Sequence, residues 1–192
     1  MLLNALFLVC CLPIVTVGTS ISALYSVCLK LVRQEEAYLT KDFFRAFRQN
    51  LKHGIILQLI LSVATIIIII DLIVMWNIME AATLYKWVFF VMVILSLFLF
   101  MASIYVYPLL AQFSNTIKGY IQNATILSVR HLPCTIMFLL LTVLPIAAAL
   151  LIPRVLLWEI LFFLLFGFSG MVYINSIFLS PLFKKYIEEG QE

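Results

Sequence analysis

The chain has 192 residues, of which 65% are hydrophobic and only 11% are charged, and its mean hydropathy is +1.18. Soluble domains are about half apolar and roughly a quarter charged. This composition therefore excludes an ordinary water-soluble fold and indicates a protein embedded in lipid. The formal net charge of +3 is small, and we expect no nucleic-acid partner.

The first 32 residues are apolar but are interrupted at Leu12-Pro13 and at Gly18-Thr19-Ser20. A helix over residues 1–12 would be about 18 Å long, which is short of a hydrocarbon core of roughly 30 Å. We predict a short helical hairpin with its turn at residues 13–18 and its second helix at 19–32. A cleaved signal peptide is the alternative, but the segment lacks a basic leader and a small-x-small cleavage site.

Residues 33–53 are the most charged part of the chain. Within them, aromatic and aliphatic side chains fall on one helical face and basic side chains on the other. This pattern predicts an amphipathic interfacial helix over about 41–52, capped by Thr40 or Asp42. The apolar face comprises Phe43, Phe44, Phe47 and Leu51, and the basic face comprises Arg45, Arg48 and Lys52.

Four apolar segments are long enough to cross a bilayer. They are residues 54–75, 87–110, 134–151 and 156–179. We expect a loop over residues 71–86 between the first two, flanked by Trp76, Tyr85 and Trp87, because such aromatics favour the membrane interface.

A second amphipathic helix is predicted around residues 116–131, between the second and third crossings. Its apolar residues recur at helical spacing, so that one face is apolar and the other polar. These residues are Ile117, Tyr120, Ile121, Ala124 and Leu127.

The basic residues orient the predicted crossings. Ten of the twelve Lys and Arg residues lie in segments 30–53, 112–133 and 181–192, and the other side keeps only Lys86 and Arg154. Because short basic loops stay in the cytoplasm, we expect both amphipathic helices and the C-terminus to be cytoplasmic. The sequence thus predicts an all-α, polytopic protein of a plasma membrane, with about six helices in a single domain over residues 1–192.

An internal repeat is a further prediction. A shift of 82 positions places Tyr25 on Tyr107 and Arg48 on Arg130, which pairs residues 19–76 with 87–152. Repeated helix groups are common in transporters. Chance similarity between helical membrane segments is the alternative.

Two acidic residues lie within apolar surroundings. Asp71 interrupts a long aliphatic run, and Glu159 follows Trp158. A charge inside a membrane is costly and is usually functional. However, Asp71 lies about 25 Å along a helix from Gly54, so a solvated helix end is the favoured interpretation for both acids.

Basic residues at the membrane entry points are the candidate contact sites. They could bind lipid phosphates, a partner protein or an anionic solute, although anchoring under the positive-inside rule also explains them. The candidates are Arg45, Arg48, Lys118, Arg130 and His131, and His53 has a similar position.

The sequence contains no recognisable catalytic, nucleotide-binding or metal-binding motif. Its cysteines lie in or beside apolar runs without ligand spacing, which indicates small hydrophobic residues. We therefore expect no enzyme activity, no cofactor and no metal. The cysteines are Cys10, Cys11, Cys28 and Cys134.

Four blocks of the sequence, in order along the chain, carry a family resemblance. They are LPIVTVGTSISALYSVCLKLVR, KDFFRAFRQNLKHGI, YPLLAQFSNTIKGYIQNATILSVRHLPCTI and YINSIFLSPLFKKYI. With these blocks the chain resembles the YesL family, integral membrane proteins of unknown function from Gram-positive bacteria. Members are often encoded beside carbohydrate ABC importers, so the resemblance implies a link to sugar uptake.

Two functional hypotheses follow. The first is an accessory or regulatory protein of carbohydrate uptake that contacts a carbohydrate ABC transporter through its cytoplasmic helices. Gly119 and Leu132-Pro133 resemble part of the loop through which ABC permeases dock their ATPase, although the glutamate of that loop is missing. The second is a small-solute transporter, for which few polar groups near the bilayer midplane are available. They are Ser62, Thr65, Ser96, Thr142 and Ser169.

Overall fold

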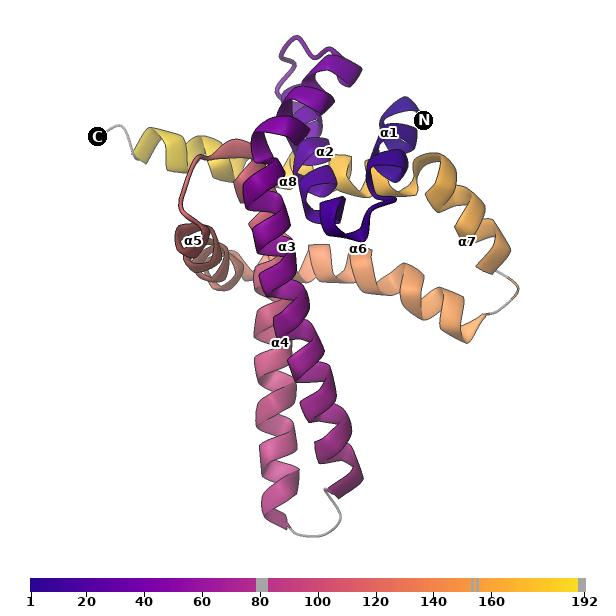
Figure 1. Cartoon of the computed structure of the whole chain (residues 1–192), viewed down its shortest axis with the longest axis vertical. Coiled ribbons are helices and arrows are strands. Elements are labelled where there is room, and N and C mark those ends of the chain that lie inside the picture. Colours follow the sequence, from indigo (N-terminus) through magenta and orange to yellow (C-terminus); the bar gives the residue numbers. More distant parts are fainter. Residues whose placement is uncertain (79–82, 153, 155, 190–192) are drawn as a thin grey trace.

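The computed structural model describes residues 1–78, 83–152, 154 and 156–189 (Figure 1). Within these ranges every regular element is a helix, which confirms the predicted all-α class. The elements in chain order are α1 (Leu2–Cys10), the short 3₁₀ helix η1 (Ile14–Thr16), α2 (Val17–Val32), α3 (Leu39–Ile78), α4 (Thr83–Gln112), α5 (Ile117–Arg130), α6 (Leu132–Leu151), α7 (Leu156–Phe162), the π-helix η2 (Phe163–Gly167) and α8 (Phe168–Glu189).

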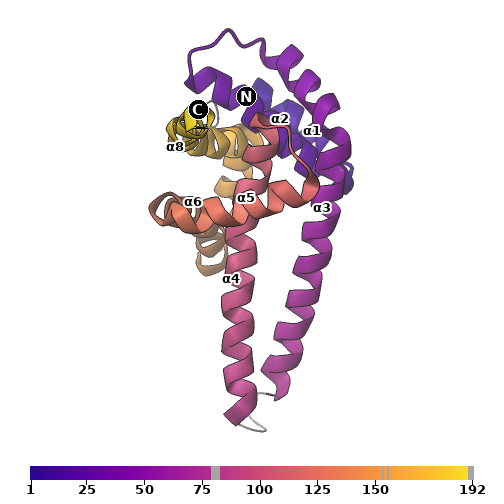
Figure 2. The same ribbon diagram turned by 90° about the vertical axis from the view of Figure 1, so that its left-hand side faces the viewer.

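The helices form a head and a stem. We define the stem as residues 62–78 of α3 and 83–101 of α4, because none of their described side chains is buried. These two segments extend together away from the rest of the molecule (Figures 1 and 2). The head contains the other helices and the remaining parts of α3 and α4. Within the head, α6 and α8 run crosswise to the stem helices (Figure 1), and α5 is seen lengthwise in Figure 2.

Five helical stretches are long and apolar enough to cross a membrane. On the stem, large aliphatic side chains such as Ile66, Ile70 and Val91 are more than half exposed. Contiguous apolar surface of this kind needs lipid around it, and helices satisfy their own backbone groups there. The five stretches are Ile14–Val32, Leu39–Ile78, Leu84–Gln112, Leu132–Leu151 and Leu156–Lys184.

Helix α3 corrects one prediction. The amphipathic segment 41–52 and the crossing 54–75 are a single helix of 40 residues, about 60 Å long and so roughly twice the thickness of a hydrocarbon core. The change from a one-sided to an all-round apolar pattern does not break the helix, because no proline interrupts it. Gly54 is buried against Thr19 of α2, so this glycine permits close packing.

Two further boundaries differ from the predictions. The loop expected over residues 71–86 is largely helical, since α3 continues to Ile78 and α4 resumes at Thr83, while residues 79–82 lie outside the described residues. The crossing expected at 156–179 is divided by η2, where the chain changes direction between α7 and α8 (Figure 1). By contrast, α5 closely matches the predicted helix at 116–131, and Thr116 caps it by accepting the Gly119 N–H at 3.2 Å.

Helix α2 lies at the centre of the head. Leu24 and Val27 of α2 are fully buried, and they pack with Phe7 of α1 and Phe43 of α3. A second apolar cluster joins the other face of α2 to the remaining helices of the head. Its buried aromatic members are Tyr25, Tyr105, Tyr120, Phe138 and Phe183, and Leu57 of α3 belongs to the same cluster.

Asn4 ties α1 to the π-helix. Its side chain is fully buried, and its Nδ2 atom donates to the carbonyl oxygens of Phe163 and Leu164, at 2.8 Å each. Its Oδ1 atom accepts the backbone N–H of Ser169 at 3.1 Å. One amide side chain therefore satisfies three backbone groups at the distorted turn between α7 and α8.

Asp42 joins the start of α3 to α2. Its side chain is 7% exposed, and Oδ2 accepts the Tyr38 N–H at 3.1 Å and lies 3.4 Å from the Lys30 ammonium. Asp42→Ala is expected to lower the free energy of unfolding by about 1–3 kcal/mol, because it leaves the Tyr38 N–H and the partly buried Lys30 cation without an acceptor. Chemical denaturation of the full chain in detergent micelles measures this loss.

The matched control is Glu35→Ala. Glu35 is half exposed and lies 3.9 Å from the Arg33 guanidinium, and a long ion pair with a half-exposed acid contributes at most about 1 kcal/mol. Equal losses in the two variants would contradict the assigned role of Asp42.

Candidate functional site

A polar hollow opens where α2, α3, α4 and α5 meet. Its volume is about 360 Å³, and most of its lining side chains are polar and uncharged. Amides and hydroxyls arranged in this way can donate and accept hydrogen bonds with a neutral polar solute. The polar lining residues are Ser26, Gln49, Asn50, His53, Gln112, Ser114, Asn115 and Tyr120.

Several of these groups are held in place by neighbouring helices. The Asn50 Nδ2 atom donates to the Ser22 hydroxyl of α2 at 3.1 Å. The Tyr120 hydroxyl donates to the Phe113 carbonyl at 2.7 Å and accepts the Asn115 N–H at 2.9 Å. The hollow therefore has a fixed wall, and the His53 ring lies edge-on to Tyr120 with 6.4 Å between ring centroids.

Most of the polar contacts that link the helices inside the head were not predictable from the sequence, although the amide of Asn175 within the last crossing does indicate a hydrogen bond between helices. The Tyr107 hydroxyl donates to Gln58 Oε1, and the Asn175 Nδ2 atom donates to the Tyr25 hydroxyl at 3.2 Å. The Tyr105 and Thr135 hydroxyls lie 2.9 Å apart. A polar residue inside a predicted crossing was the available signal, but its partner on another helix could not be read from the sequence.

The hydroxyl groups expected at the midplane do not form a common site. Thr65, Ser96 and Thr142 each donate to a carbonyl of their own helix, at 2.7–2.8 Å. Ser169 does the same with the Phe166 carbonyl at 3.1 Å. These bonds satisfy the hydroxyls locally, so these four residues offer little to a solute. Ser62 differs, because its hydroxyl accepts the Gln58 Nε2–H at 3.2 Å.

Arg45 and Arg48 belong to a basic stripe along the outer face of α3. The stripe consists of Lys41, Arg45, Arg48 and Lys52, all of them exposed and spaced three or four residues apart, which aligns them on one helical face. Arg45 lies 3.7 Å from Asp42. Among the described residues Arg48 forms no ion pair or hydrogen bond, so its guanidinium is available to a partner.

The other three basic candidates lie elsewhere. Lys118 is exposed in the first turn of α5, while Arg130 and His131 are at its other end. The Arg130 guanidinium lies 5.6 Å from the centroid of the Tyr186 ring of α8, and the His131 Nε2 atom is 3.4 Å from the Tyr186 hydroxyl. The structure thus brings Arg130 and His131 together around Tyr186, on different helices from the basic stripe.

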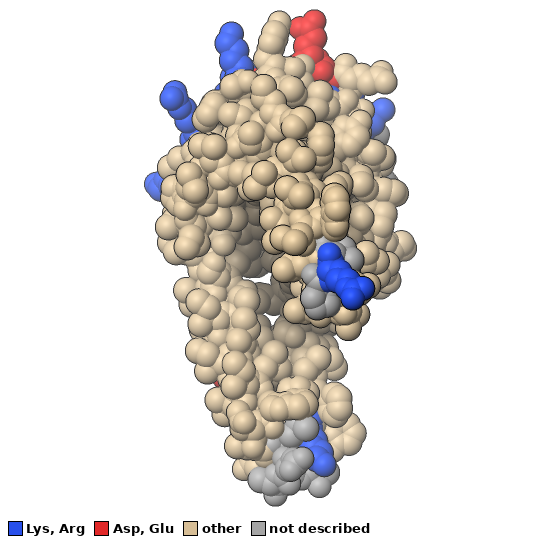
Figure 3. Space-filling model, turned by 90° about the vertical axis from the view of Figure 1, so that its right-hand side faces the viewer, with Lys and Arg blue, Asp and Glu red and all other residues tan. Residues whose placement is uncertain are grey.

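Charged side chains gather at one end of the molecule. In Figure 3, blue and red side chains project from the top of the head, whereas most of the remaining surface in this view is tan. Blue side chains also lie on the flank of the head and near the tip of the stem, so the view agrees only in part with the charge asymmetry on which the predicted orientation rests. Which side of the membrane the charged end of the head faces stays a prediction.

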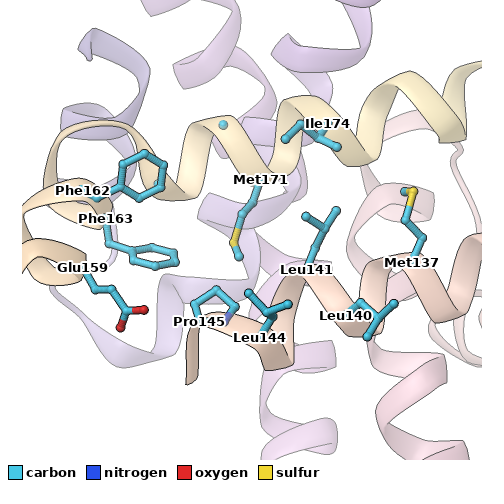
Figure 4. Close-up of a pocket in the computed structure, with 12 residues that line it drawn as sticks. Met137, Leu140, Leu141, Leu144, Pro145, Glu159, Phe162, Phe163, Met171 and Ile174 are labelled. Atoms are coloured by element: carbon cyan, nitrogen blue, oxygen red, sulfur yellow. The ribbon is translucent and has the colours of Figure 1, made fainter. Parts of the chain in front are cut away.

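The two acids in apolar surroundings have different environments. Asp71 lies on the stem, seven residues before the end of α3. Glu159 lies on α7 and lines an apolar cavity of about 520 Å³ between α6 and α8, and its carboxylate is turned toward Pro145 of α6 (Figure 4). The interpretation of Glu159 as a simple helix end missed this cavity.

The cysteines lie in partly or fully buried surroundings. All four are free, and burial raises the pKa of the Cys10 and Cys11 thiols above the ordinary value. A raised pKa lowers the thiolate fraction near neutral pH and so weakens the nucleophile. Within the described part of the chain, no three His, Cys, Asp or Glu residues lie close enough to hold a metal ion.

Comparison with known families gives a partial match. Residues 1–72 match one family model. That model is described as a protein of unknown function, DUF624. The matched part contains α1, α2 and most of α3, including Asn4, Asp42 and the basic stripe. Neither the curated proteins nor the solved structures gave a match.

Proposed function

We propose that this chain is a YesL-like, non-enzymatic accessory or regulatory protein of carbohydrate uptake in a bacterial plasma membrane. In this proposal the head faces the cytoplasm and contacts a carbohydrate ABC transporter. The match of residues 1–72 to a family of unknown function is consistent with a YesL-like protein. The link to carbohydrate uptake rests on the resemblance alone.

The observation that carries the proposal is the basic stripe on α3. Its four cations stand on the exposed face of a helix whose other face is buried in the head. Beside them is a shallow hollow of about 570 Å³ lined by Thr40, Phe44 and Gln49 together with three of the basic residues. Arginine beside apolar and aromatic surface is enriched at protein interfaces, so the stripe suits an acidic partner surface.

The test is crosslinking and affinity purification from native membranes, with the partners identified by mass spectrometry. The double variant Arg45→Glu/Arg48→Glu is expected to reduce recovery of a sugar ABC permease or its ATPase at least tenfold, because charge reversal repels an acidic partner. Lys86→Glu, near the far end of the stem, is the matched control and should leave recovery unchanged. Equal recovery from both variants, or absence of a sugar transporter from the wild-type sample, would overturn the proposal.

The polar hollow favours a second candidate function, transport of a small neutral solute. Its uncharged lining suits hydrogen bonding to hydroxyl groups. Flux measurements in proteoliposomes across a broad panel of sugars separate this function from the first. Uptake by wild-type vesicles above that of empty vesicles would support transport, and its absence across the panel would count against it.

A further inference from the structure

The apolar cavity beside Glu159 has the features of a ligand site. It lies between α6 and α8 and is closed at one end by α7 and η2 (Figure 4). Its volume of about 520 Å³ is within the range of small-molecule pockets. Apart from Glu159, every lining side chain is aliphatic, aromatic or thioether. The cavity therefore combines one carboxylate with a large apolar surface.

Glu159 has no polar partner within the described ranges of the chain. Its side chain is half-buried, and among the residues that the structure describes it forms neither an ion pair nor a hydrogen bond. A carboxylate against apolar walls is costly unless a cation or a hydrogen-bond donor meets it. In Figure 4 the carboxylate lies at the end of the cavity, beside Phe163 and Pro145, where a bound molecule would reach it.

Two irregularities in the helices border the cavity. Pro145 lies inside α6 and has no N–H to offer the carbonyl of Leu141, one turn earlier. On the opposite wall, η2 begins at Phe163 and ends at Gly167, and a Cβ atom at Gly167 would lie 2.5 Å from the Phe163 ring. Gly167 thus leaves space for this ring. π-Helical turns are rare and occur frequently at functional sites.

The lining selects a class of ligand. Aromatic rings next to a carboxylate attract organic cations, because the ring faces and the carboxylate both carry negative potential. Phe162 and Phe163 supply the rings. Met137 and Met171 supply flexible thioethers, which adapt to apolar groups of different shapes. We propose that this cavity binds a small organic cation with an apolar body, whose charge is neutralised by Glu159.

The site is separate from the basic stripe and from the polar hollow, since no residue lines both this cavity and either of them. Its lining residues Leu140, Leu144 and Phe162 are more than half exposed, so a ligand with an apolar body could enter from the lipid phase. A lipid acyl chain would fit the walls equally well but would gain nothing from the carboxylate. Removal of the charge at residue 159 should therefore weaken binding of the cation but not of an acyl chain.

The test measures equilibrium binding of radiolabelled tetraphenylphosphonium to the purified full chain in detergent micelles, with empty micelles subtracted. Wild-type protein is expected to bind it saturably, and Glu159→Gln to bind at least tenfold more weakly. Asp71→Asn is the matched control, because it removes an acid of the stem and should leave the affinity unchanged. Tetraphenylborate, an anion of the same shape, should not bind saturably.

Three results would overturn the proposal: no saturable binding of the cation by the wild type, equal affinity in Glu159→Gln, or equally tight binding of tetraphenylborate. The last result would mean that the cavity takes apolar molecules irrespective of charge. The unfolding temperature checks that Glu159→Gln is folded. Met171→Trp, which fills the cavity and keeps the carboxylate, is a second variant that should lose the cation, and undiminished binding there would also count against the site.

Discussion

Replacing Asn4 by leucine is expected to lower the free energy of unfolding by about 2–4 kcal/mol. Leucine has a similar size, but it cannot donate to the Phe163 and Leu164 carbonyls or accept the Ser169 N–H. Each buried polar group that loses its partner costs about 1–3 kcal/mol. The sum over the three backbone groups is expected to stay at about 2–4 kcal/mol, because single hydrogen bonds between membrane helices contribute less than this. Thermal unfolding of the full chain in detergent micelles measures the effect.

Asn77→Leu is the matched control for this prediction. The Asn77 Nδ2 atom also donates to a carbonyl at 2.8 Å, but that carbonyl belongs to Ile73 of its own helix and the side chain is exposed. Solvent or headgroups can replace such a bond, so the change should stay within about 0.5 kcal/mol. An Asn4 variant as stable as the Asn77 variant would show that α1 does not hold the π-helix.

The sequence predicted those parts of the fold that depend on local pattern. The bounds of α5 follow from its apolar spacing, and three of the four apolar segments lie in long helices as expected, whereas η2 divides the segment at 156–179. The continuity of α3 was not predictable in the same way. A helix can change its surroundings from a packed head to lipid without a break in the backbone, so a change of composition after Lys52 was mistaken for a boundary.

The candidate sites also differ in whether a local sequence pattern predicts their surroundings. Exposure of Arg45 and Arg48 follows from helical spacing, because they lie opposite Phe43 and Ala46, which are buried. The surroundings of Glu159 depend instead on the change of direction at η2 and on the packing of Asn4 against it. Asn4 and η2 are far apart in the sequence, and no local pattern indicates that they meet. The predicted repeat between residues 19–76 and 87–152 stays a prediction.

Gly54→Leu is expected to separate α2 from α3 and to abolish the folded state. At this position a Cβ atom would lie 2.5 Å from Thr19 Oγ1 and 2.9 Å from Thr19 Cα. Because the second contact is with the backbone of α2, no change of side-chain rotamer relieves it. Small residues allow this kind of close approach between membrane helices, and overpacking of a tight core costs about 1–3 kcal/mol even for small insertions.

A graded series shows whether close packing is the reason for the loss. Gly54→Ala should retain a folded protein with an unfolding free energy lowered by about 1–3 kcal/mol, and Thr19→Ala in the same chain should restore part of it by removing the nearer atom. Gly170→Ala is the matched control, since no heavy atom lies within 4 Å of its added Cβ and alanine favours the helix by up to about 1 kcal/mol. If both alanine variants stabilise the protein, the α2–α3 contact does not require glycine.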